Sequence, residues 1–167
     1  MKQTLKYIYD KLYENMKYAE GKHSIILALS SAVIAFATTF FSDNLFQNIF
    51  ATSCLVFALI SIIYCFCALV VRNQKPRARK NPKTDNLLDY RQIITHDEES
   101  YLKAISKKYK FLNDYKPDEM DTELTKQIIS ISKAINTKFT FFNFSVVFLV
   151  FSIICGIVVV LIRGNLW

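Results

Sequence analysis

Three long stretches of the chain contain no charged residue, and they constrain its fold more than any other feature. They cover residues 24–41, 48–71 and 140–162, and are 18, 24 and 23 residues long. A helix needs about 20 apolar residues to cross the ~30 Å hydrocarbon layer of a bilayer. Long helices in the core of a soluble protein normally keep a polar face, which these stretches lack. The sequence therefore predicts an all-α membrane protein with three transmembrane helices.

The distribution of Lys and Arg predicts the orientation of these helices. Residues 1–23 contain five of them and residues 72–139 contain fifteen, whereas residues 42–47 contain none and residues 163–167 contain one. Cytoplasmic segments of membrane proteins carry an excess of Lys and Arg. We therefore expect the N-terminus and residues 72–139 in the cytoplasm, with an external hairpin at 42–47 and an external C-terminal tail. The first uncharged stretch begins only after a mostly polar segment with five lysines, so we expect no cleavable signal peptide.

Two of the predicted transmembrane helices extend beyond the uncharged stretches. Near the N-terminus, residues suited to one helix face recur every three or four positions: Leu5, Ile8, Leu12, Met16, Ala19 and His23. A second series precedes and enters the third stretch: Leu124, Ile128, Ile131, Ile135, Phe139 and Phe142. We predict that both helices continue into a cytoplasmic helical bundle. For residues 1–22, a helix lying flat on the membrane is the alternative.

A shorter cytoplasmic helix is predicted to begin at Asp97. Acidic residues at its start and lysines from Lys107 onward complement the helix dipole. Its narrow apolar face contains Tyr101, Ile105, Lys108 and Leu112. We expect this helix to pack on other cytoplasmic helices, because such a narrow stripe cannot form a core alone.

A basic segment follows the second uncharged stretch. Six basic residues lie within twelve positions: Arg72, Lys75, Arg77, Arg79, Lys80 and Lys83. Such a segment is typical of a linker attracted to anionic lipid headgroups. The alternative is a phosphate-binding arm for a nucleotide or oligonucleotide, with Arg77, Arg79 and Lys80 as the candidate contacts.

The first transmembrane helix carries a continuous stripe of small or hydroxylated residues: Ser24, Ala28, Ser31, Ala35 and Thr38. Such a stripe either lets another helix approach closely or lines a narrow path for water and ions. None of the three stretches contains a charged residue, which disfavours a proton relay or a transporter with a charged central site. A pore formed here would therefore be gated by packing and dewetting.

The residue pattern favours neither catalysis nor a metal site. No nucleophile, base and orienting group occur in a recognisable arrangement, and the three glycines form no phosphate loop. All four cysteines lie in the uncharged stretches without metal-ligand spacing. We expect a protein that is not an enzyme and that holds no metal or cofactor.

Five short motifs together indicate a family. They lie at residues 19–24 (AEGKHS), 86–90 (NLLDY), 97–101 (DEESY), 127–132 (QIISIS) and 135–139 (INTKF). Taken in order, these motifs make the chain resemble the Pycsar-type transmembrane effectors of bacterial anti-phage nucleotide-signalling systems, including Hailong-like relatives. In that family the first motif usually has alanine at the positions of Gly21 and His23.

The resemblance implies a multi-pass protein of the bacterial inner membrane, encoded near a nucleotidyltransferase or cyclase. It would respond to the nucleotide or oligonucleotide messenger of that enzyme and permeabilise the membrane, causing depolarisation and growth arrest. A net charge of +7 suits a polyanionic ligand. Because three spans cannot easily enclose a water path, we expect a homo-oligomer and favour a tetramer. The alternatives are a non-conducting scaffold or accessory subunit that recruits a cytoplasmic partner, and a toxin-like protein that disrupts lipid without a defined pore.

The resemblance also directs attention to the cytoplasmic ends of the first and third spans. Lys22 and Lys138 each directly precede a span, where they either anchor helix depth or surround the inner mouth of a pore. Together with Arg91 and the basic segment, they are candidate ligand contacts. Gly21 is a candidate hinge, because Gly costs about 1 kcal/mol relative to Ala inside a helix.

Overall fold

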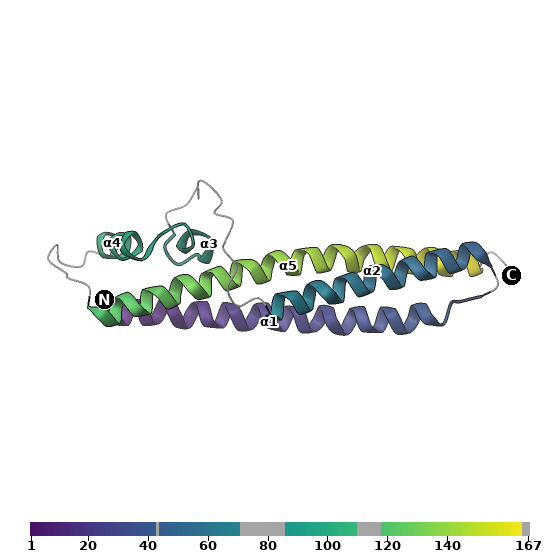
Figure 1. Ribbon diagram of the computed structural model, residues 1–167, viewed down its shortest axis with the longest axis horizontal. Coiled ribbons are helices and arrows are strands. Elements are labelled where there is room, and N and C mark those ends of the chain that lie inside the picture. The colour runs from purple at the N-terminus through teal and green to yellow at the C-terminus, as the bar shows by residue number, and fades with distance from the viewer. Residues whose placement is uncertain (43, 71–85, 110–117, 165–167) are drawn as a thin grey trace. The chain divides into compact units, whose positions relative to one another are not determined.

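The computed structural model describes residues 1–42, 44–70, 86–109 and 118–164. Figure 1 shows the helices that these residues form, without any strand: α1 (Lys2–Thr38), α2 (Leu45–Val70), α3 (Tyr90–Ile93), α4 (Glu98–Lys108) and α5 (Glu119–Gly164). Three of them, α1, α2 and α5, are long and apolar enough to cross a membrane. The predicted all-α membrane fold is therefore confirmed.

The chain divides into two compact units. We call Met1–Ala19 with Val71–Lys138 the polar unit, and Glu20–Val70 with Phe139–Trp167 the apolar unit. Helices α1 and α5 contribute residues to both units. No Gly or Pro lies between residues 118 and 155, which is why α5 continues without a break from polar to apolar sequence.

In the polar unit, the N-terminal part of α1 packs beside the first part of α5 (Figure 1). Leu5, Ile8 and Leu12 are each at most 1% exposed, so most of the predicted apolar stripe is buried within the protein, although Met16 is only half-buried. The Lys2 Nζ atom lies 2.9 Å from Asp118 Oδ2, which joins the starts of the two helices. This burial supports the predicted bundle over a helix lying flat on a membrane.

The buried face of α5 in the polar unit differs in part from the predicted apolar stripe. Ile128 and Ile135 are buried as expected, but Leu124 and Ile131 are only half-buried. In their place, three polar residues of the same helix are fully buried: Asp121, Thr125 and Ser132. Apolar periodicity shows which face of a helix is hydrophobic, whereas the packing of neighbouring helices determines which face is buried.

Helix α4 begins where the sequence predicts. Asp97 caps it by accepting a hydrogen bond from the Ser100 N–H at 3.2 Å, and Ser100 Oγ accepts one from the Asp97 N–H at 3.1 Å. Hydrogen bonding of the Asp97 carboxylate to the Ser100 side chain, and next to the Ser100 N–H, lowers the pKa of this carboxyl. Acidic residues in the first turn and Lys107 and Lys108 in the last complete the predicted charge pattern.

The buried face of α4 differs from the predicted stripe, because Leu102 is buried as well. Tyr101 and Ile105 are fully buried, whereas Lys108 is exposed, and Leu112 lies outside the described residues. The Tyr101 hydroxyl donates a 2.7 Å hydrogen bond to the Leu87 carbonyl. Burial raises the pKa of this phenol well above its usual range. Tyr101 therefore ties α4 to the segment that precedes α3.

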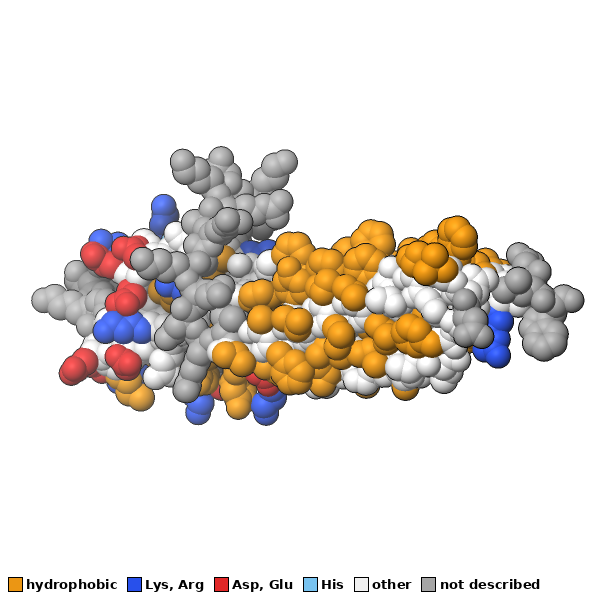
Figure 2. Space-filling model, turned by 45° about the vertical axis from the view of Figure 1, so that its right-hand side comes forward, with side chains coloured by type: hydrophobic (Ala, Val, Ile, Leu, Met, Phe, Trp, Pro, Cys, Tyr) orange, Lys and Arg blue, Asp and Glu red, His pale blue; other side chains and the backbone are white. Residues whose placement is uncertain are grey.

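In the apolar unit, α2 lies beside the apolar parts of α1 and α5 (Figure 1). Ile26, Cys65 and Leu149, one from each helix, form the centre of its core. Figure 2 shows hydrophobic side chains over much of the visible face of this unit, which is the surface expected for helices surrounded by lipid.

Candidate functional site

The predicted pore-lining residues all lie on one exposed face of α1. Ser24, Ala28, Ser31, Ala35 and Thr38 are exposed in the single chain. The three hydroxyl groups donate to carbonyl oxygens of the same helix, at 3.2 Å, 2.9 Å and 2.8 Å in chain order. The stripe is thus an uncharged surface whose hydroxyl groups are hydrogen-bonded within α1. Another helix, lipid or water can contact it.

The opposite face of α1 carries a polar contact that joins all three long helices. Ser30 Oγ lies 3.1 Å from Ser61 Oγ on α2, and the Ser61 hydroxyl donates to the Ser145 carbonyl on α5 at 2.8 Å. All three serines are fully buried. Because hydrocarbon offers no competing partner, these bonds fix the rotation of each helix about its axis.

A second polar contact joins α2 to α5. The Ser152 hydroxyl donates to the Cys54 carbonyl at 2.7 Å, and its oxygen lies 3.4 Å from Cys54 Sγ. Both residues are fully buried. The helices of the apolar unit are therefore held together by hydrogen bonds at two levels, in addition to apolar packing.

Lys22 and His23 contact the aromatic residues that begin the apolar part of α5. The Lys22 Nζ atom lies 5.6 Å from the centre of the Phe139 ring and 5.3 Å from that of Phe142, within the range of cation–π contacts. The His23 ring packs edge-on against Phe142, with centroids 5.7 Å apart, and is 1% exposed. His23, the last residue of the predicted stripe near the N-terminus, is thus packed between helices.

The other predicted ligand contacts have different surroundings. Lys138 is buried in the polar unit, with 6% exposure. Arg91 is exposed, and its Nε donates a 3.1 Å hydrogen bond to the Tyr90 hydroxyl. This hydrogen bond is the main reason that the pKa of Arg91 is raised. Arg77, Arg79 and Lys80 lie outside the described residues.

Gly21, the hinge candidate, lies inside α1 and is exposed. A Cβ atom added there would meet no atom within 4 Å. The boundary between the two compact units falls between Ala19 and Glu20, just before this glycine. Packing therefore does not require a glycine at this position.

Sequence reasoning did not identify Ser30 as a contact residue. Its neighbour Ser31 belongs to the small-residue stripe, and hydrophobic periodicity cannot separate two adjacent serines in an uncharged run. The spacing of residues could have identified it. Ile26, Ser30 and Ala37 are separated by four and seven positions, which places them on one helix face, and this face is buried. The serines of the second and third spans would then be candidate partners.

The comparison with protein families gives one match. The model described as the Pycsar effector protein domain matches residues 4–164, which is nearly the whole chain. No curated protein and no solved structure matches the chain.

Proposed function

Because the chain belongs to the family of Pycsar effector proteins, we propose that it forms an ion-conducting pore between copies of itself, gated by the nucleotide or oligonucleotide messenger of a partner cyclase or nucleotidyltransferase. Membership of this family supports the general role of a transmembrane effector of anti-phage defence. Pore opening in the bacterial inner membrane would depolarise the cell and arrest its growth. The N-terminus and the polar unit face the cytoplasm in this proposal, where the messenger is made.

The interior of the apolar unit favours a path between copies over a path through one subunit. Ile26, Cys65 and Leu149 meet at its centre, and Ser61 is hydrogen-bonded to both neighbouring helices. Opening a water path there would break these contacts. Several copies of the chain are therefore needed, and we favour four.

The exposed stripe of α1 is the observation that supports the pore most directly. Its five members form a continuous strip of small side chains on a unit whose other exposed residues include many large apolar ones. Rotation of a Ser or Thr hydroxyl away from its own helix would offer a hydrogen bond to passing water. Copies that turn this face toward a common axis would line a narrow, uncharged pore.

Arg91 and Lys138 of the polar unit are proposed contacts of the messenger, and Lys22 of the apolar unit is a separate candidate. Arg91 presents an exposed guanidinium group beside the Tyr90 ring, a pair suited to a phosphate and a stacked base. Lys22 and Lys138 lie next to the unit boundaries in α1 and α5. Binding there could move α1 about Gly21 and reorient the stripe.

Ion flux from liposomes that contain the purified chain tests the proposal. Flux is measured with and without cyclic mononucleotides, cyclic oligonucleotides and linear oligonucleotides. We expect one messenger class to change the flux, in either direction. A cross-linking or mass measurement in detergent gives the number of copies, for which we expect four.

A pair of variants tests the path itself. Ser31→Leu combined with Thr38→Leu should abolish flux, because branched apolar side chains would fill and dewet the pore. Ala32→Leu is the matched control, since Ala32 is also exposed on α1 but lies outside the stripe. Equal flux from both proteins would refute the assignment of the stripe. The absence of flux from folded, inserted wild-type protein would favour the non-conducting scaffold.

A further inference from the structure

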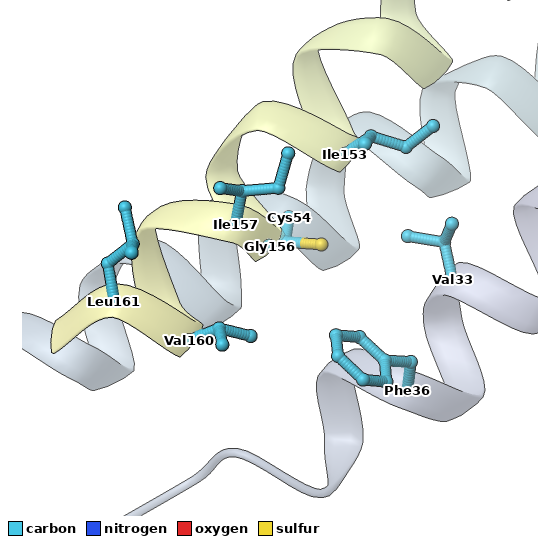
Figure 3. A pocket seen from close by; sticks show the side chains of 8 residues that line it. All are labelled: Val33, Phe36, Cys54, Ile153, Gly156, Ile157, Val160 and Leu161. Atoms are coloured by element: carbon cyan, nitrogen blue, oxygen red, sulfur yellow. The ribbon is translucent and has the colours of Figure 1, made fainter. Parts of the chain in front are cut away.

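The apolar unit contains a cavity of about 240 Å³ between its three helices. Figure 3 shows Val33 and Phe36 of α1 on one side and residues of α5 on the other, including Ile157 and Leu161. Cys54 of α2 and the bare backbone of Gly156 form its floor. The cavity therefore belongs to the part of the protein that lies in the membrane.

The lining excludes water and ions as occupants. Its side chains are aliphatic or aromatic except for Cys54, whose sulfur already lies against the Ser152 hydroxyl. A buried water needs about two to four polar partners, whereas a dry apolar cavity of about 150 Å³ already binds a benzene-sized molecule. An apolar occupant suits this half-open space best, and hydrocarbon chains are the apolar molecules of a bilayer.

A cation lies at the same end of the unit. Arg163, in the last turn of α5, is exposed, and its guanidinium carbon lies 5.6 Å from the centre of the Phe40 ring. Phe40 lines a smaller space that shares Phe36, Cys54 and Gly156 with the large cavity. An apolar surface thus leads from the cavity to a guanidinium group, which binds phosphate oxygens well.

We propose that this cavity holds an acyl chain of an anionic phospholipid whose phosphate is bound by Arg163. A second copy of the chain is the competing occupant. A copy inserted in the same orientation presents its own Arg163 at this level, and one guanidinium cation does not pair with another. A phosphate neutralises this charge instead, which is why the lipid is favoured. The proposal depends on membrane insertion but not on ion conduction.

Native mass spectrometry of the full chain in detergent tests this site. The protein is mixed with equal amounts of phosphatidylglycerol and phosphatidylcholine that carry the same acyl chains. We expect phosphatidylglycerol to be bound about fivefold more, which corresponds to about 1 kcal/mol. In Arg163→Gln this preference should fall to nearly one, while the total bound lipid stays similar. Equal binding of the two lipids by the wild-type protein would overturn the assignment of Arg163.

Gly156→Leu tests the cavity. A Cβ at position 156 would lie 3.6 Å from Cys54 Sγ, which is an ordinary contact. Alanine therefore fits at this position, whereas the rest of a leucine side chain would occupy the cavity. We expect binding of both lipids to fall about fivefold or more, whereas Gly156→Ala, the matched control, should bind as the wild type does.

A second variant that fills the cavity provides the same test if Gly156→Leu does not fold. Ile157→Trp enlarges a side chain that is 54% exposed, and Val147→Trp is its control on the same helix, away from the cavity. Lipid binding that persists in the filled variants refutes the proposal. If those variants instead lose subunit association, a second copy is the occupant.

Discussion

The hydroxyl group of Ser61 should stabilise the three-helix apolar unit. Its removal in Ser61→Ala should therefore lower the free energy of unfolding measurably. Ser61 donates to the Ser145 carbonyl at 2.8 Å and lies 3.1 Å from Ser30 Oγ, so the variant loses two interhelical hydrogen bonds. Such bonds contribute about 0.6 kcal/mol each on average in membrane proteins, with a maximum of about 1.7. The freed Ser30 hydroxyl can turn to a carbonyl of its own helix, which limits the loss. We expect the free energy of unfolding to fall by roughly 1–2 kcal/mol.

The measurement is an SDS titration in mixed micelles, followed by energy transfer between dyes on α1 and α5. Ser30→Ala breaks only one of the two bonds, so it should cost about 0.6 kcal/mol. The double variant should cost less than the sum of the single variants, because both remove the same contact.

Ser31→Ala is the matched control for this series. Its exposed hydroxyl bonds only to the Leu27 carbonyl of its own helix, so the change should stay within about 0.5 kcal/mol. If Ser61→Ala cost no more than Ser31→Ala, the buried serine contact would not hold the helices together.

Three further predictions concern the polar unit and its boundary. Gly21→Ala should raise the stability of α1 by about 1 kcal/mol, because the added Cβ meets nothing, and should weaken messenger-dependent flux; unchanged flux would refute the hinge. Tyr101→Phe leaves the Leu87 carbonyl without its 2.7 Å bond and should cost about 1–3 kcal/mol in thermal unfolding, whereas Tyr109→Phe, at an exposed site, should cost little. The pKa of Asp97 is lowered in the folded chain, so its contribution to α4 is present above the usual aspartate pKa and is lost as the pH falls through the lowered value. Amide exchange in the first turn of α4 should therefore accelerate at acidic pH, and Asp97→Asn, which can still cap the helix, should remove most of this dependence.

The sequence alone was sufficient to predict the three long helices, their membrane-spanning character and the start of α4, whereas the short helix α3 was not predicted. Three uncharged stretches, the Asp97 cap and the absence of Gly and Pro between residues 118 and 155 are local features. Local features determine whether a backbone can form a helix and whether that helix can remain in hydrocarbon. The family resemblance, carried by short motifs along the chain, agrees with the match over residues 4–164.

Only the tertiary structure decided which face of each helix is buried. Ser30 and Ser31 are adjacent and chemically identical, yet one is bonded to Ser61 in the core and the other is exposed. The same holds in α5, where Asp121 is buried and the more apolar Leu124 is only half-buried. In a uniformly apolar span no contrast with water orients the helix, so its rotation is determined by the few positions where side chains interlock and hydrogen-bond across helices.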